Sequence, residues 1–294
     1  MKRAHAAAAL ALLALCSVTP GSAQVRASEP ASVTQTVDGT KITIDYSRPQ
    51  ARGRDSVFGG EVKWNEVWTP GANSATTLEV SKDVMLDGHP VKQGKYSVWL
   101  VIRAEGPWTM VLDPRDKLFH TVHPDSTADQ LRYQVTPGTG PFTEVLVWSF
   151  PEVRIGGATL TMSWGTVRVP FQIEVPPSYT LRIPPREALP YVGTYDLHWV
   201  ENGVADTASN PFTMTSRDGT LHGEWRTPPF PGAGPFALVQ IQPTWFTIAL
   251  LRDGQVYDFL SDLTYEFTVE GGRATSVELR DEKDQLIGAG KRLR

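Results

Sequence analysis

The feature that most constrains the fold of this chain is a period-two alternation of apolar and polar residues, which recurs along most of its length. Residues 167–175 read VRVPFQIEV and residues 42–46 read ITIDY, so apolar side chains fall on every second position. Successive side chains of an extended strand point to opposite faces, so this pattern is typical of half-buried strands. Turn pairs such as Asp87-Gly88 and Gly156-Gly157 separate the runs. Together they predict an all-β protein made of sandwiches or barrels.

A proline-rich segment divides the chain into two parts. Residues 176–190 read PPSYTLRIPPREALP, and the five prolines cannot donate to a sheet ladder. Such a segment favours an extended, stiff spacer. We therefore predict an N-terminal β-sandwich or barrel-like domain over residues 24–175, a linker over 176–190, and a small C-terminal β-barrel over 191–294.

The first 23 residues have the order of an export signal. Lys2 and Arg3 precede an apolar stretch from Ala6 to Val18, and Gly21-Ser22-Ala23 supplies small residues before Gln24. We predict a signal peptide over residues 1–23, cleavage after Ala23, and a periplasmic or extracellular protein. No later segment is long and apolar enough to span a membrane.

Cleavage at that point changes the composition in two ways. It removes the chain's one cysteine, Cys16, so disulfides and thiol catalysis are both excluded for the mature chain. It also removes Lys2 and Arg3, which moves the formal net charge from −4 to −6. Nucleic-acid binding usually needs a basic stripe, and none is present, so we expect no nucleic-acid partner.

The first predicted domain carries an ordered series of short motifs between Tyr46 and Ser97. They are Tyr46-Ser47-Arg48-Pro49, Gly53-Arg54, Phe58-Gly59-Gly60, Val67-Trp68, Gly71-Ala72-Asn73, Ala75-Thr76-Thr77 and Gly94-Lys95-Tyr96-Ser97. On these motifs, the region from Ser32 to Val175 resembles the DUF2911 family of exported bacterial proteins of unknown function. The resemblance implies export and a β-rich fold, and it implies no established activity. The chain departs from the family pattern between Asp113 and Asp125, where residues 119–123 read FHTVH in place of a typical Trp-Gly segment.

The second predicted domain resembles the small lipocalin-like β domains that are attached to secreted hydrolases. The likeness rests on Tyr191-Val192-Gly193-Thr194-Tyr195 and on the closing Gly290-Lys291-Arg292. It implies a small barrel, which either holds a small apolar ligand or provides a docking surface. No hydrolase domain precedes it here, so the resemblance implies no catalytic residue.

The run from Tyr46 to Thr77 holds the candidate binding residues. Arg48, Arg52 and Arg54 lie within seven residues, and arginine presents a rigid fork that suits carboxylate or phosphate. The alternative is local pairing with Asp45, Asp55, Glu61 or Glu66, which abound nearby.

Four further side chains in the same run have two interpretations each. Trp64 and Trp68 either grip an apolar or sugar ligand or pack in the core. Asn73 and Thr76 either donate to a ligand or belong to a tight turn, for which Gly71-Ala72-Asn73-Ser74 has suitable chemistry.

No standard catalytic or cofactor signature is present in the sequence. The chain lacks a Gly-x-Ser-x-Gly elbow, a Ser-x-x-Lys pair, a His-Glu-x-x-His motif and a Walker loop. His120, His123 and Asp125 invite a metal interpretation, but residues three apart on a strand point to opposite faces. We therefore predict no catalytic residue, no metal site and no cofactor.

These patterns favour an exported, non-catalytic binding protein of unknown ligand. Its predicted site lies where Arg48, Arg54, Trp64, Trp68, Asn73 and Thr76 converge, and its partner is a small molecule, a carbohydrate or an envelope protein. One alternative is an unusual hydrolase of envelope carbohydrate or ester, since two-carboxylate chemistry leaves no sequence motif. Another is a structural envelope protein with a protein partner.

Overall fold

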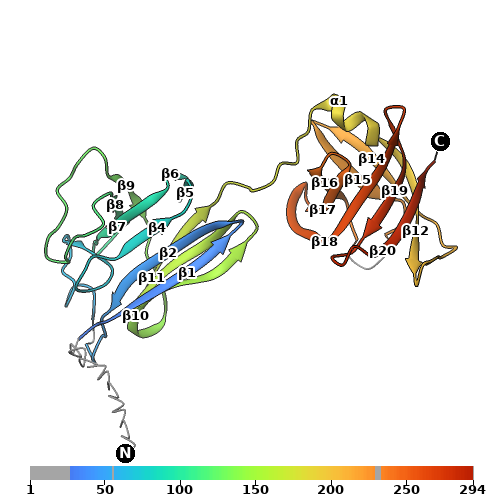
Figure 1. The fold of residues 1–294 in the computed structure, drawn as a ribbon. Helices are drawn as coiled ribbons and strands as arrows, with labels where there is room; N and C mark the ends of the chain where they lie inside the picture. The colour runs from blue at the N-terminus through green and yellow to red at the C-terminus, as the bar shows by residue number, and fades with distance from the viewer. Residues whose placement is uncertain (1–26, 55, 229–232, 294) are drawn as a thin grey trace, which may run out of the picture.

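The structure, a computed structural model, describes residues 27–54, 56–228 and 233–293. The predicted signal peptide over residues 1–23 lies outside this part of the chain. Within it, strands make up nearly all of the regular structure, and the only helical elements are α1 (Pro185–Ala188) and the 3-10 turn η1 (Leu189–Tyr191). The all-β prediction is confirmed (Figure 1).

Two antiparallel sheets form the N-terminal part of the described chain. The first is seven-stranded, with the order β1-β2-β4-β7-β8-β9 and β3 paired to β7. Its strands are β1 (Glu29–Val37), β2 (Thr40–Arg48), β3 (Val67–Trp68), β4 (Thr77–Val80), β7 (Gly94–Val101), β8 (Trp108–Asp113) and β9 (Leu131–Val135). The second is four-stranded, with the order β10-β11-β5-β6. Its strands are β5 (Val84–Leu86), β6 (His89–Val91), β10 (Gly138–Arg154) and β11 (Gly157–Glu174).

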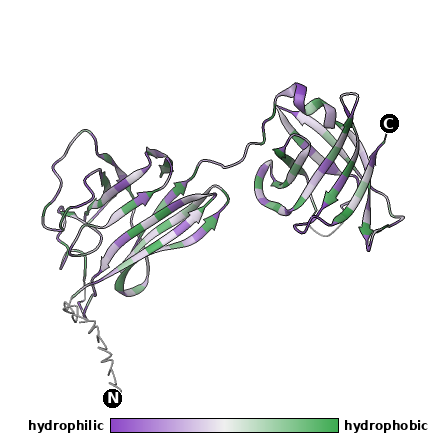
Figure 2. Cartoon of the chain, viewed as in Figure 1, coloured by the Kyte–Doolittle hydropathy of each residue, from purple (hydrophilic) through white to green (hydrophobic). Residues whose placement is uncertain are grey.

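One hydrophobic core joins these two sheets into a sandwich. It contains Ile44 and Leu100 from the larger sheet and Leu146 and Phe171 from the smaller one, all fully buried. The alternation that marked the strands in the sequence is visible along them (Figure 2). On β2, the apolar side chains face the core, which leaves Asp45 on the outer face of the larger sheet.

The C-terminal part is an up-and-down barrel. Its strands are β12 (Gly193–Glu201), β13 (Val204–Ala205), β14 (Asn210–Arg217), β15 (Thr220–Trp225), β16 (Phe236–Gln242), β17 (Trp245–Arg252), β18 (Gln255–Glu270), β19 (Arg273–Arg280) and β20 (Leu286–Arg292). From β12 through β14 to β20, each strand pairs with the next along the chain, and β20 pairs back to β12 to close the barrel. The remaining strand, β13, only extends a hairpin from β12. The predicted small C-terminal barrel is therefore confirmed.

The interior of this barrel is filled by aromatic rings. Tyr195, Phe212, Phe236 and Tyr265 contact one another there with ring centroids 5.4–6.2 Å apart. The cavity lined by described residues beside them holds about 20 Å³. That is enough for about one water molecule, whereas ligand pockets usually measure about 300 Å³ or more. The described residues therefore enclose little free volume beside these rings, and a small apolar ligand in the barrel stays a prediction.

The predicted linker differs from a plain extended spacer at its C-terminal end. Pro185 occupies the start of α1, where a missing N–H and a fixed φ favour a helical turn. Ala188 and Tyr191 from this turn pack into the barrel core. Nearer its start, the segment contacts Asp38, whose carboxylate accepts the Ser178 N–H at 2.7 Å.

In the described part of the chain, no helix is long and apolar enough to cross a membrane.

Candidate functional site

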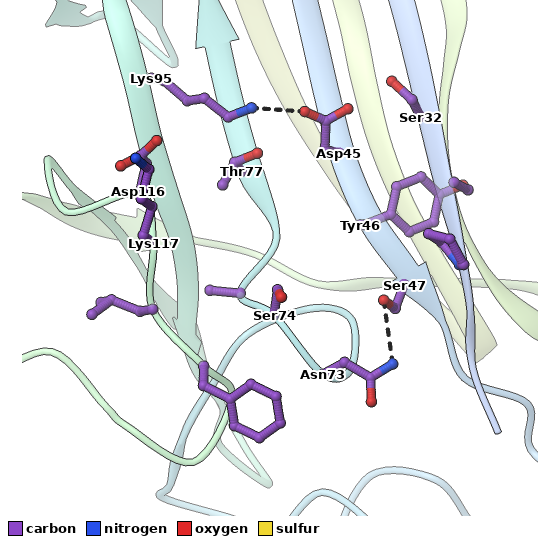
Figure 3. Close-up of a pocket in the computed structure, with 15 residues that line it drawn as sticks. Ser32, Asp45, Tyr46, Ser47, Asn73, Ser74, Thr77, Lys95, Asp116 and Lys117 are labelled. Carbon is purple, nitrogen blue, oxygen red and sulfur yellow. Dashed lines mark hydrogen bonds and ion pairs between the residues drawn. The ribbon is translucent and has the colours of Figure 1, made fainter. Parts of the chain in front are cut away.

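Two surface hollows lie beside the run that the sequence singled out. A polar cleft of about 460 Å³ is lined by residues that include Arg52, Arg54, Glu61, Glu66, Trp68, His120, Thr121, His123 and Trp164. An open hollow of about 830 Å³, which we call the sheet groove, is lined by residues that include Ser32, Asp45, Asn73, Thr77, Lys95, Asp116, Lys117 and Phe119 (Figure 3).

A short ridge of paired backbone separates the cleft from the groove. Ser74 and Phe119 form a β-bridge, the Ala75 N–H donates to the Leu118 carbonyl at 2.9 Å, and the His120 N–H donates to the Asn73 carbonyl at 2.8 Å. Next to the ridge, Gly71, Ala72, His120 and Thr121 line the cleft, whereas residues 73–75 and 117–119 line the groove. The two hollows therefore share walls but have different chemistry.

Asn73 and Thr76 are held by the fold in ways that match the turn interpretation. Asn73 adopts a left-handed φ of 61°, which asparagine tolerates, and its amide donates to the Ser28 carbonyl at 3.2 Å. Thr76 is fully buried, and its hydroxyl donates to the Pro70 carbonyl at 3.0 Å. Asn73 lines the groove, whereas the Thr76 side chain lies in the interior beneath the ridge.

The arginines of the run divide between structural and surface positions. Arg48 donates from Nε to the Leu146 carbonyl at 3.3 Å, which ties the end of β2 to β10, and it lines neither hollow. Arg54 forms an ion pair with Glu61 at 3.1 Å and donates to two backbone carbonyls, so the predicted local pairing occurs. Arg52, the neighbour with φ 53°, donates to the Ala27 carbonyl and also lines the cleft.

The two tryptophans of the run also separate. Trp68 stacks on Trp164 with ring centroids 6.0 Å apart and lines the cleft with its other surface. Trp64 covers Gly59, where an added Cβ would lie 2.4 Å from the indole nitrogen, and it lines neither hollow. Of the six predicted residues, the cleft thus gathers Arg54 and Trp68, while Asn73 lies in the groove.

A buried donor lies at the wall of the cleft. Trp164 is only 2% exposed, and its Nε1 has no hydrogen-bond acceptor among the described residues. Most buried polar atoms are paired, because an unpaired one costs about 1–3 kcal/mol. The stack of Trp68 on Trp164 therefore covers a polar group that the core itself does not satisfy.

The two histidines reach the cleft from the loop between β8 and β9. Asp113 anchors this loop: its buried carboxylate accepts the Arg115 N–H and Nε at 2.8 Å and also accepts a hydrogen bond from Gln130. Burial alone would raise the pKa of Asp113, but these hydrogen bonds outweigh it and lower the pKa to about 2. His123 also holds the loop in place, because its ring makes a T-shaped contact with the Trp99 ring, with the ring centroids 5.9 Å apart.

The environment of His120 favours its neutral form. Burial lowers the pKa of His120 below its ordinary value, and the neighbouring His123 lowers it further. Sequence reasoning weighed these histidines only as metal ligands and missed their place beside Arg54 and Trp68. The departure from the family pattern at residues 119–123 was the available signal. In the described ranges, no group of three or more His, Cys, Asp or Glu side chains is arranged to hold a metal ion.

The sheet groove has a polar floor that the strand register builds. Ser32 lies opposite Asp45 across β1 and β2, and Asp45 lies opposite Thr77 across β2 and β4. From β7, the Lys95 ammonium contacts the Asp45 carboxylate at 2.8 Å (Figure 3). It also lies 3.7 Å from the Glu79 carboxylate. The hydrogen bond from Lys95 offsets burial and lowers the pKa of Asp45, while the same contact raises the pKa of Lys95.

The fold and these hollows define an all-β protein with two polar surface hollows on its N-terminal sandwich. Residues 28–173 match the model of the family described as "Protein of unknown function (DUF2911)", so this part of the chain belongs to that family. The resemblance drawn from the motifs between Tyr46 and Ser97 is thereby confirmed. No curated protein and no solved structure matches the chain.

Proposed function

We propose that this protein is an exported, non-catalytic binding protein and that its ligand lies in the polar cleft. The observation that carries the proposal is the convergence of Arg52, Arg54, His120 and His123 around the exposed surface of Trp68. Ligand sites typically combine an aromatic wall with a few fixed polar groups, and this cleft has both.

The donors of the cleft are held in place before any ligand arrives. Arg54 is fixed by Glu61 and by the carbonyls of Gln50 and Ala51, which leaves its Nε without a hydrogen-bond partner among the described residues. Trp68 is fixed by its stack on Trp164. A preorganised cation and ring lose little conformational entropy on binding, which favours affinity for a small ligand that has acceptor oxygens and an apolar face.

A thermal-shift screen of residues 24–294 tests this proposal. The panel contains envelope sugars, fatty acids, nucleotides and divalent metals, and a ligand at 100 times its dissociation constant stabilises the fold by about 2.7 kcal/mol. We expect a hit whose shift is lost in the Arg54→Gln/Trp68→Phe double variant. The matched control is Arg48→Gln/Trp64→Phe, which changes the same residue types in the same run outside the cleft.

The screen has three possible outcomes, and each favours a different conclusion about the cleft. Loss of the shift in the cleft variant alone supports the proposed site. An equal shift in both variants, with circular dichroism showing both folded, rules the cleft out. If no compound in the panel shifts the melting temperature, a structural envelope protein is favoured, and partner capture is the next experiment.

Export rests on residues 1–23, whose sequence has the features of a cleavable signal. Expression of the full chain in a Gram-negative host, followed by N-terminal sequencing of the periplasmic fraction, tests it. The expected mature protein begins at Gln24. A cytoplasmic protein that retains Met1 would contradict export.

Hydrolysis of envelope carbohydrate or ester is a second candidate that one observation favours. The cleft brings His120 and His123 near Thr121, Glu61 and Glu66, which are side chains of the kinds that serve as base, nucleophile and acid. A lowered pKa keeps His120 neutral and able to accept a proton at neutral pH. If hydrolysis occurs, turnover of nitrophenyl esters or glycosides falls at least about 100-fold in His120→Gln. No turnover by the unaltered protein removes this candidate.

A further inference from the structure

The outer face of the seven-stranded sheet presents a fixed row of polar side chains. Ser32, Asp45 and Thr77 occupy directly paired positions on β1, β2 and β4, so the row spans two strand spacings, roughly 10 Å. Three neighbouring strands of one sheet hold it, and Figure 3 shows Asp45 and Thr77 beside Lys95 on that face. The backbone at Asp45 is paired with Ser32 on one side and with Thr77 on the other, so the three side chains keep fixed positions.

The charges that line the groove cancel. Asp45 and Asp116 line the groove together with Lys95 and Lys117, so the formal charge of the lining is zero. Lys95 is held 2.8 Å from Asp45, which removes most of its attraction for a free anion. An ionic ligand therefore gains little here. A hydroxyl group suits the site better, because it can donate to the Asp45 carboxylate and accept from the Lys95 ammonium.

One end of the groove is apolar and exposed. Phe119 is 48% exposed, and the bridge to Ser74 holds its backbone at the ridge. Its ring lies against His120, with centroids 4.5 Å apart, so its orientation is fixed while one side stays open. Leu118 and Ala75 line the groove next to it. An aromatic surface beside a neutral polar floor matches a ring with hydroxyls on its rim and C–H groups on its face.

We propose that the sheet groove is a second binding site, distinct from the polar cleft, and that it takes the uncharged, hydroxyl-rich rings of a neutral carbohydrate. Asp45 and Lys95 bind the ring hydroxyls, and Phe119 stacks on the C–H face. The groove volume of about 830 Å³ is within the usual range for ligand sites. The ridge of residues 73–75 and 118–120 separates this site from the cleft, so the two bind independently.

A glycan array that displays neutral and acidic oligosaccharides tests this proposal with labelled protein of residues 24–294. We expect neutral oligosaccharides to bind, and binding to weaken about tenfold or more in Asp45→Asn and in Phe119→Ala, as loss of one good contact implies. Arg54→Gln/Trp68→Phe retains this binding, which keeps failure of the cleft proposal distinguishable from failure of this one.

Two controls match the test variants in chemistry. Asp83→Asn removes a carboxylate that is paired to Lys92 at 2.8 Å, as Asp45 is to Lys95, and Phe142→Ala removes a phenylalanine that is 57% exposed. Neither lines the groove. The proposal fails if no neutral oligosaccharide binds, if acidic glycans bind in preference to neutral ones, or if the control variants weaken binding as much as the groove variants.

Discussion

At the scale of the residue, hydrogen-bond partners decide what each polar side chain of the run from Tyr46 to Thr77 does. Thr76 gives its hydroxyl to a buried carbonyl, Asn73 gives its amide to Ser28, and Arg48 ties two strands together. Arg54 is also paired, but its partner Glu61 lies at the surface, and both side chains line the cleft. The same residue types therefore lie in the interior or at the cleft according to where their partners lie.

Asp113 supports a prediction about stability and pH. Its pKa in the folded protein is about 2, below the ordinary 3.8, so its contribution to folding is present above about pH 4 and is lost as the pH falls towards 2. The shift corresponds to about 2 kcal/mol. We expect Asp113→Asn to lower the free energy of unfolding by about that amount at pH 7 and to flatten its pH dependence between pH 4 and 2. Urea denaturation at several pH values measures both.

The control for this prediction is Asp83→Asn. Asp83 pairs with Lys92 in an exposed position, where solvent screens the attraction and such pairs contribute little to stability. We expect it to leave the free energy of unfolding nearly unchanged at pH 7. If the two variants behave alike, Asp113 is not the anchor of the histidine-bearing loop.

At the scale of the element, closure decides how the C-terminal strands become a barrel. β20 returns to pair with β12, and the last arginine of β20 reaches across the barrel end. Arg292 donates to the carbonyls of Pro190 at 3.1 Å and Ala274 at 3.2 Å, and also to Val192. Its guanidinium lies 5.7 Å from the centre of the Tyr195 ring. One side chain thus joins η1, β12, β19 and β20.

Arg292→Met is expected to destabilise the barrel. The substitution keeps an unbranched apolar stem but removes the guanidinium and leaves half-buried carbonyls without their donor, which should lower the free energy of unfolding by about 2–4 kcal/mol. Calorimetry measures the change. Lys291→Met is the matched control, because Lys291 is exposed on the same strand, and we expect it to alter the free energy by less than about 0.5 kcal/mol. Similar losses in both variants would contradict the role of Arg292.

At the scale of the whole molecule, the described chain has two large hydrophobic cores. The first draws its buried residues from Val37 to Val175, and the second draws its residues from Ile183 to Leu279. Tyr179 and Leu181, from the predicted linker, pack against a smaller cluster on β16 and β17. The sequence-based boundary at residue 191 therefore falls after residues that the barrel uses.

Two folding units remain a prediction that calorimetry can test. We expect residues 24–294 to unfold in two transitions, one of which is reproduced by the fragment 24–175 and the other by the fragment 176–294. A fragment that begins at residue 191 should be less stable than 176–294 by about 2–4 kcal/mol, because it lacks Ile183, Ala188 and the Tyr179–Phe259 contact. A single transition for the full chain, or equal stability of the two barrel fragments, would contradict this division.

Much of the fold could be predicted because local pattern and burial agree in this chain. Alternation at residues 42–46 and 167–175 identified strands that the structure has at β2 and β11, and turn pairs such as Asp87-Gly88 fall between strands with the positive φ values they favour. Strand pairing brings distant segments together, however, and alternation does not specify which strands pair. The sandwich order and the closing pair of β12 and β20 therefore could not be predicted.

The sequence by itself determined the all-β class, the family of residues 28–173, and the run in which part of the candidate site lies. Only the tertiary structure decided which residues of that run meet. It placed Arg54 and Trp68 in one cleft with His120 and His123, which lie more than fifty positions away, and it buried Thr76. The physical reason is that composition and period fix the face of a strand on which a side chain lies, whereas a binding site depends on contacts between segments that only the folded sheets bring together.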